Sequence, residues 1–134
     1  MDTCALPPFP LNAWYAAAWD HEVKRDLLPR TICNQKIVFW RRSDGSVAAV
    51  EDVCWHRLLP LSLGRLDGDD VVCGYHGLAF DGHGRCTRMP SQERLNPSAC
   101  VRSFPTVQKH RFVWVWPGDP ALADPATIPD LHWN

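Results

Sequence analysis

The stretch that decides the fold is CWHRLLPLSLGRLDGDDVVCGYH, residues 54–76. It begins with Cys54 and His56, which one residue separates, and it ends with Cys73 and His76, which two residues separate. Each pair supplies one thiolate and one imidazole from a short loop. Because these groups are the ligands of zinc and of iron–sulfur clusters, the spacing predicts a metal centre held between two facing loops.

Two kinds of centre accept two cysteines and two histidines. A zinc finger usually takes both cysteines from one knuckle and both histidines from a helix, whereas each loop here mixes the two residue types and no helical pattern surrounds them. In a Rieske [2Fe–2S] cluster, two cysteines hold one iron and two histidines hold the other, so two facing loops must each reach both irons. The sequence therefore favours a Rieske cluster, with structural zinc as the alternative.

Length and composition restrict the class of protein. A chain of 134 residues with a formal net charge of −1 is one ordinary domain without the basic stripe that nucleic acid needs. No apolar run approaches the roughly 20 residues of a membrane span, and the N-terminus lacks a signal-peptide pattern, so we expect a cytoplasmic protein without a membrane partner. Cytosolic cysteines are kept reduced, which favours metal ligation over disulfides. The cysteines without a nearby histidine are expected to be buried or incidental thiols: Cys4, Cys33, Cys86 and Cys100.

The secondary-structure pattern is that of an all-β chain. Short β-type runs alternate with Gly, Asp and Pro, and no long segment has an apolar period near 3.6 residues. Residues 43–45 and 82–84 are each flanked by two such runs and predict hairpin turns. The run at 112–116 predicts a strand buried on both sides, with Phe112, Trp114 and Trp116 on one face and Val113 and Val115 on the other.

The domain organisation follows from where the strands stop. Residues 1–116 are expected to form the metal-binding domain. Residues 117–134 contain four prolines and no strand alternation, so we expect an extended connection toward a further domain that this chain lacks.

Three segments resemble one known family. CWHRLLPLSLGR (54–65) and VVCGYHGLAFDGHGRC (71–86) resemble the N-terminal Rieske domain of Rieske non-haem iron aromatic-ring oxygenases. FPTVQKHRFVWVWPGDPALADPATIPD (104–130) is similar to the segment that follows this domain in vanillate O-demethylase oxygenase components. The resemblance implies an antiparallel β-sandwich with a small cluster-binding subdomain. It also implies that Cys54 and Cys73 hold the inner iron, and that His56 and His76 hold the outer one.

Three positions distinguish this chain from other Rieske proteins. Trp55 stands between two ligands where the family often has proline. Rieske proteins of respiratory complexes carry two further cysteines, joined as a disulfide, at the places that Leu59 and Tyr75 occupy here. The resemblance is therefore to the low-potential branch, near about −150 mV. Gly74 and Gly77 are expected either to let backbone N–H groups approach the cluster sulfurs or to serve as ordinary turn glycines.

The resemblance implies a role in electron transfer. A flavin and iron–sulfur reductase would pass electrons from NADH to the cluster, which would pass them to a mononuclear Fe(II) that activates O2 on a methoxy-aromatic substrate. That iron needs two histidines and a carboxylate. The other histidines are scattered along the sequence: His21, His83, His110 and His132. We therefore expect the Fe(II) site in the absent domain and no catalytic residue in this chain. A full-length subunit is a possible homotrimer; the alternative is a stand-alone Rieske ferredoxin that only shuttles electrons.

Overall fold

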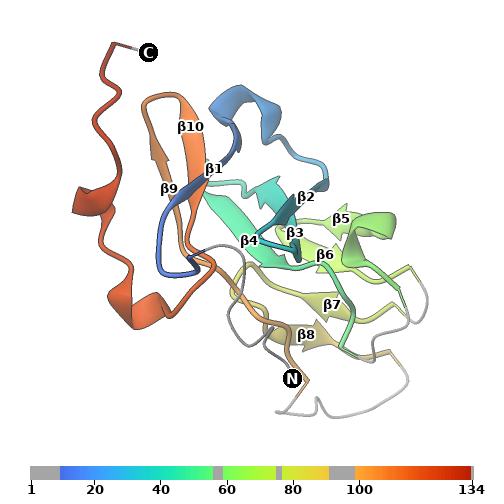
Figure 1. Cartoon of the computed structure of the whole chain (residues 1–134). Helices are drawn as coiled ribbons and strands as arrows, with labels where there is room; N and C mark the ends of the chain where they lie inside the picture. The colour runs from blue at the N-terminus through green and yellow to red at the C-terminus, as the bar shows by residue number, and fades with distance from the viewer. Residues whose placement is uncertain (1–9, 56–58, 75–76, 91–98, 134) are drawn as a thin grey trace, which may run out of the picture.

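The computed structural model describes residues 10–55, 59–74, 77–90 and 99–133 (Figure 1). Within them, antiparallel strands form three sheets, in the orders β1-β10-β9, β2-β3-β4 and β5-β6-β7-β8. Their bounds are β1 (Tyr15–Trp19), β2 (Leu28–Ile32), β3 (Gln35–Arg41), β4 (Val47–Glu51), β5 (Arg65–Asp67), β6 (Asp70–Val72), β7 (Ala79–Phe80), β8 (Cys86–Arg88), β9 (Thr106–Lys109) and β10 (Phe112–Val115). The predicted all-β, antiparallel fold class is confirmed.

The sheet β2-β3-β4 shares one apolar cluster with each of the other two sheets. Val38 and Trp40 on β3 belong to the cluster that also contains residues of β6 and β7. Ile37 and Phe39, which alternate with them, belong to the cluster that contains residues of β1 and β10. Because successive side chains of a strand point to opposite faces, β3 is buried on both sides, which explains its unbroken apolar run.

The hairpins and the aromatic strand predicted from the sequence are confirmed. Residues 43–45 lie in the turn between β3 and β4, and residues 82–84 lie in the turn between β7 and β8. In β10, Val113 and Val115 lie in an apolar cluster while Trp114, on the other face, is also buried.

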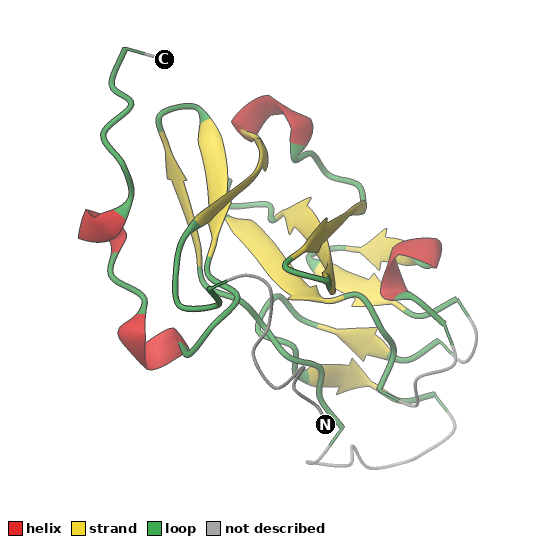
Figure 2. Cartoon of the chain, viewed as in Figure 1, coloured by secondary structure: helices red, strands yellow, loops and turns green. Residues whose placement is uncertain are grey.

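Helical structure is limited to short 3-10 turns in the part of the chain that is described (Figure 2). These are η2 (Asp20–Glu22), η3 (Leu61–Leu63), η4 (Pro120–Leu122) and η5 (Pro125–Thr127). No helix of the described segments has the length and apolar character needed to cross a membrane.

The Pro-rich segment after β10 contains no strand in residues 117–133, as expected, but it is not extended throughout. It makes the turns η4 and η5, and it contacts the beginning of the chain. The indole Nε1 of Trp14 donates to the carbonyl oxygen of Asp124 at 2.9 Å, and the backbone N–H of Asp119 donates to Oδ1 of Asn12 at 2.8 Å. These contacts hold the segment against residues 12–14.

Two tight hairpin turns are made without glycine. Cys33 and Asn34, between β2 and β3, have φ values of 53° and 62°. His110 and Arg111, between β9 and β10, have φ values of 56° and 68°. Two successive positive φ values are the geometry of a type I′ turn, which suits the twist of a hairpin but strains residues that carry a Cβ.

We therefore expect Arg111→Gly to stabilise the protein. Glycine adopts a positive φ without steric cost, and this gain outweighs its larger entropy loss on folding by roughly 0.5–1 kcal/mol in the free energy of unfolding. Denaturant unfolding would measure the change. Lys109→Gly, in the neighbouring strand β9, is the control and should destabilise by a similar amount. Destabilisation by both variants would contradict the prediction.

Candidate metal centre

The first ligand loop begins where β4 ends. Cys54 lies three residues beyond Glu51, and its backbone N–H donates to the carbonyl oxygen of Leu59 at 2.9 Å. This bond joins the two described ends of the loop. The side chain of Cys54 is fully buried, at 0% exposure. The fold therefore presents this thiol to the interior.

The second ligand loop is closed in the same way. Cys73 directly follows β6, and its backbone N–H donates to the carbonyl oxygen of Leu78 at 2.7 Å, again five residues further on. Its own carbonyl oxygen accepts from the N–H of Gly77 at 3.1 Å. Gly77 has a φ of +73°, so the loop needs a residue without Cβ there. Cys73 is 2% exposed.

The two loops approach each other at Gly64, which ends η3. A Cβ built on Gly64 would lie 1.8 Å from the carbonyl oxygen of Val72, the residue before Cys73. Arg65 and Val72 are paired in the antiparallel ladder of β5 and β6, which fixes this close approach. Cys54 and Cys73 belong to one buried cluster.

These thiols fit the cysteine half of a Rieske cluster. Two buried cysteines at equivalent positions of two loops can supply soft thiolate ligands in a dry environment. The other predicted ligands, His56 and His76, lie outside the described residues, as does Tyr75. In the segments that are described, no three His, Cys, Asp or Glu side chains gather in a group able to hold a metal ion.

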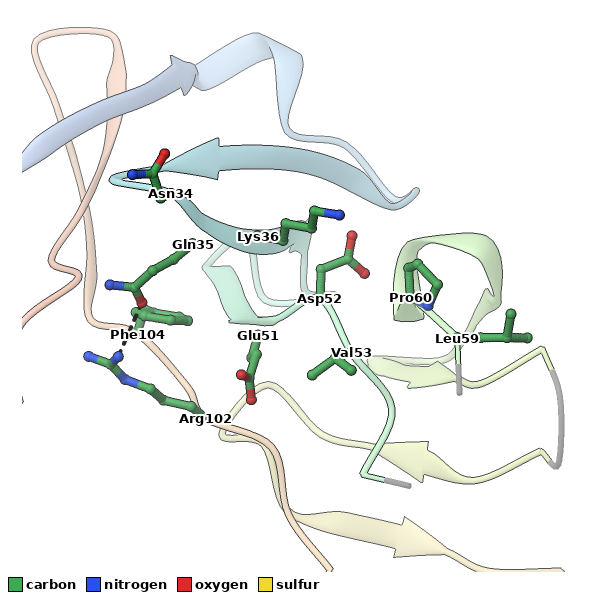
Figure 3. A pocket seen from close by; sticks show the side chains of 10 residues that line it. All are labelled: Asn34, Gln35, Lys36, Glu51, Asp52, Val53, Leu59, Pro60, Arg102 and Phe104. Carbon is green, nitrogen blue, oxygen red and sulfur yellow. Dashed lines mark hydrogen bonds between the residues drawn. The ribbon is translucent and has the colours of Figure 1, made fainter. Parts of the chain in front are cut away.

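The surface around the two loops is partly apolar. Leu63 is 68% exposed and Trp55 is 37% exposed. A groove of about 370 Å³ runs beside the second loop, and the following residues line it: Leu63, Gly64, Arg65, Val72, Cys73, Gly74 and Gly77. A second pocket of about 420 Å³ lies beside the first loop, where Val53, Leu59 and Pro60 line it together with Glu51 and Asp52 (Figure 3).

Three residues of the site were missed by sequence reasoning. Gly64 carries the close approach of the two loops. Asp52 is buried and both of its carboxylate oxygens accept hydrogen bonds from Ser62. The sequence shows an Asp two residues before Cys54, but both its burial and its partner are known only from the fold. Because buried carboxylates need partners, the fold then identifies the pair.

The other described cysteines are not part of the two ligand loops. Cys86 packs against the cluster that contains Cys54 and Cys73, and burial raises the pKa of its thiol. Cys33 is partly buried in a hairpin turn, and Cys100 is exposed. A hydrogen-bonding interaction with the Cys33 side chain is the main cause that raises the pKa of Tyr15 to about 12. Cys4 lies outside the described residues.

Comparisons with known proteins agree with this geometry. The Rieske [2Fe–2S] domain family matches residues 13–105. The vanillate O-demethylase oxygenase subunit of a Pseudomonas strain is 49% identical over 125 residues, which are 93% of this chain and 35% of that protein. The toluene-4-sulfonate monooxygenase iron–sulfur subunit of Comamonas testosteroni is 45% identical over 92% of this chain and 36% of that protein.

Solved structures that resemble this chain are also oxygenases. A crystal structure of dicamba monooxygenase with non-haem iron and dicamba has a TM-score of 0.87 and 47% identity, covering 91% of this chain and 38% of that one. The chain thus spans little more than a third of the length of the relatives it matches. Those relatives are oxygenase components, and the similarity is to their Rieske portion.

Proposed function

We propose that this chain, which belongs to the Rieske [2Fe–2S] domain family, is the electron-accepting domain of an aromatic-ring oxygenase of the O-demethylase kind. The observation that carries the proposal is the pair of loops that each begin with a buried cysteine and close five residues later. Identities of 45–49% to oxygenase components support the assignment to this class.

In this proposal, Cys54 and Cys73 bind the inner iron, and His56 and His76 bind the outer iron. The cluster, when bound, accepts and releases one electron at a time. The chain's own contribution is to bury the thiolates and to close each loop with a backbone hydrogen bond. Water is thereby kept from the sulfur ligands, and the closed loops would orient them toward the cluster.

The partners are inferred from the relatives. Oxygenase components of multicomponent systems imply a reductase, and we propose one with flavin and iron–sulfur centres that draws electrons from NADH. The remaining length of the relatives would hold the mononuclear Fe(II) site, where O2 meets a methoxy-aromatic substrate. We further propose a cytoplasmic location and a homotrimer for the full-length subunit.

The protein expressed from its complete gene tests this function. With reductase, NADH, O2 and a methoxybenzoate, an O-demethylase converts the methyl ether to a phenol and formaldehyde, reduces the second oxygen atom to water and oxidises NADH to NAD⁺. Formaldehyde and phenol formed in equal amounts would support the proposal. Rapid reduction of the cluster without O2 uptake or product would instead identify a ferredoxin that only shuttles electrons.

The reduction potential should be low. Leu59, whose carbonyl oxygen closes the first loop, occupies the place of a disulfide cysteine in the respiratory branch. Without that disulfide, we expect a midpoint potential of about −150 mV at neutral pH. A redox titration followed by visible absorbance would measure it. A midpoint above about +100 mV would assign the protein to the respiratory branch.

A further inference from the structure

Asp52 connects the two sides of the first ligand loop. It follows β4, two residues before Cys54, and at 7% exposure it is the one buried charged residue of the described segments. Its Oδ1 accepts from the backbone N–H of Ser62 at 2.7 Å, and its Oδ2 accepts from the Ser62 hydroxyl at 2.6 Å. Because Ser62 lies in η3, beyond the loop, these bonds join residues that precede and follow the ligands.

Both ends of this connection rest on fixed structure. The backbone N–H of Asp52 donates to the carbonyl oxygen of Lys36 at 2.9 Å, which continues the pairing of β3 and β4. The side chains of these two residues lie near each other in Figure 3. On the other side, Leu61, next to Ser62, is fully buried in the cluster that contains Cys54 and Cys73. The carboxylate thus ties the sheet to η3, with the ligand loop between them.

The described parts of both ligand loops are held by hydrogen bonds. The second loop has two backbone hydrogen bonds, Cys73 to Leu78 and Gly77 to Cys73. The described part of the first loop has one backbone bond, Cys54 to Leu59, and the pair of bonds between Asp52 and Ser62 encloses it. Hydrogen bonds to a charged, buried acceptor are stronger than neutral ones, so this side-chain pair adds to the backbone bond in holding the loop.

We propose that Asp52 and Ser62 form a clamp that positions the first ligand loop, and that the clamp controls how fast the cluster is lost and how its ligands are oriented. Asp52 acts through the loop and is a positioning residue. The inference rests on the proposed ligands, since a clamp on this loop matters to a cluster only if Cys54 and His56 bind it.

The chain contains a matched control. Asp69 accepts from the backbone N–H of Ser43 at 2.7 Å through Oδ1 and from the Ser43 hydroxyl at 2.8 Å through Oδ2. This is the same pair of bonds, but it joins the turn between β3 and β4 to the turn between β5 and β6, away from both ligand loops. Asp69→Ala therefore removes the same pair of bonds to a serine, together with the ion pair between Asp69 Oδ1 and Arg25 Nη1 at 2.7 Å, without touching the proposed clamp.

The experiment follows cluster loss in the purified, cluster-loaded chain. An iron chelator is added, and the decay of visible absorbance is compared for wild type, Asp52→Ala, Asp52→Asn, Ser62→Ala and Asp69→Ala. We expect Asp52→Ala to lose its cluster about tenfold faster, because both bonds are removed. Asp69→Ala should stay within about twofold of wild type. The electron paramagnetic resonance signal of the reduced cluster should change in Asp52→Ala and not in Asp69→Ala.

Asp52→Asn distinguishes a positioning role of Asp52 from a general loss of protein stability. The Asn amide can accept from the Ser62 N–H through its oxygen and donate to the Ser62 hydroxyl through its nitrogen. Asp52→Asn should therefore retain a near wild-type rate and signal. If Asp52→Ala does not fold, Ser62→Ala replaces it. That variant keeps the backbone bond and should lose its cluster about threefold faster.

Each result decides one proposal. A wild-type chain that takes up no cluster would contradict the proposed ligands themselves. A wild-type chain that holds a cluster, with Asp52→Ala or Ser62→Ala decaying no faster than Asp69→Ala, would overturn the clamp alone. Decay of Asp52→Asn as fast as that of Asp52→Ala would also overturn it, because the hydrogen bonds would then not be the cause.

Discussion

Cys54→Ser and Cys73→Ser should each yield a chain without a cluster. Thiolate is a softer and stronger ligand for iron than a serine hydroxyl, and both cysteines are buried, so water cannot readily take their place. We expect the red-brown colour, the bound iron and sulfide, and the resonance signal of the reduced cluster to be almost entirely lost. Iron and sulfide analysis of the purified variants would measure this.

Cys86→Ser is the matched control for both variants. Its thiol packs against the same buried cluster as Cys54 and Cys73, so the substitution removes a sulfur from the same core without removing a proposed ligand. This variant should keep its iron. Loss of iron from Cys86→Ser as complete as that from Cys54→Ser would contradict the ligand assignment. A colourless wild-type protein with one tightly bound zinc would contradict the cluster.

The features that could be predicted from the sequence have local causes. The turns at 43–45 and 82–84 contain glycines, and Gly45 and Gly84 indeed have positive φ values. Strand β10 alternates aromatic and aliphatic residues, and each set needs only its own face of the sheet to be covered. The spacing within the two Cys/His pairs is equally local, and the ligand assignment drawn from it stays a prediction.

The features that were missed depend on contacts between distant segments. The turns at Cys33–Asn34 and His110–Arg111 have positive φ values without glycine, and the only indication was the mild preference of Asn and His for this conformation. Gly64 is required because Val72 of the neighbouring strand lies against it, and the clamp requires η3 to return to the end of β4. Such contacts follow from the pairing of strands that are distant in the chain, which local sequence patterns do not reveal.

The Pro-rich segment is an intermediate case. Asp119 and Asp124 are each followed by proline, and each accepts a hydrogen bond from the backbone N–H two residues later, which begins η4 and η5. Asp followed by Pro is a known helix-start signal, so these turns could have been predicted. The contact of the segment with Trp14 could not, because residues 110 positions apart form it. The domain boundary at residues 116 and 117 stays a prediction.

Gly64→Ala should strongly destabilise the protein and disturb the proposed cluster site. The new Cβ would lie 1.8 Å from the carbonyl oxygen of Val72 and 3.0 Å from its carbonyl carbon. Both are backbone atoms of a paired strand, so no side chain can rotate away, and β5 must separate from β6. Such overpacking should lower the free energy of unfolding by about 3 kcal/mol. Because Val72 precedes Cys73, the same displacement should reduce the iron content.

Gly74→Ala distinguishes this steric cause from a general need for glycine around the site. Gly74 lines the same groove, but a Cβ there would meet its nearest atom, the carbonyl oxygen of Leu63, at 3.4 Å, which is close to ordinary contact. Its free energy of unfolding should fall by less than about 1 kcal/mol, and its cluster should be retained. Denaturant unfolding and iron analysis of both variants would give the comparison. Equal losses in the two would mean that the site depends on backbone freedom in both loops, and not on the contact between Gly64 and Val72 that holds them together.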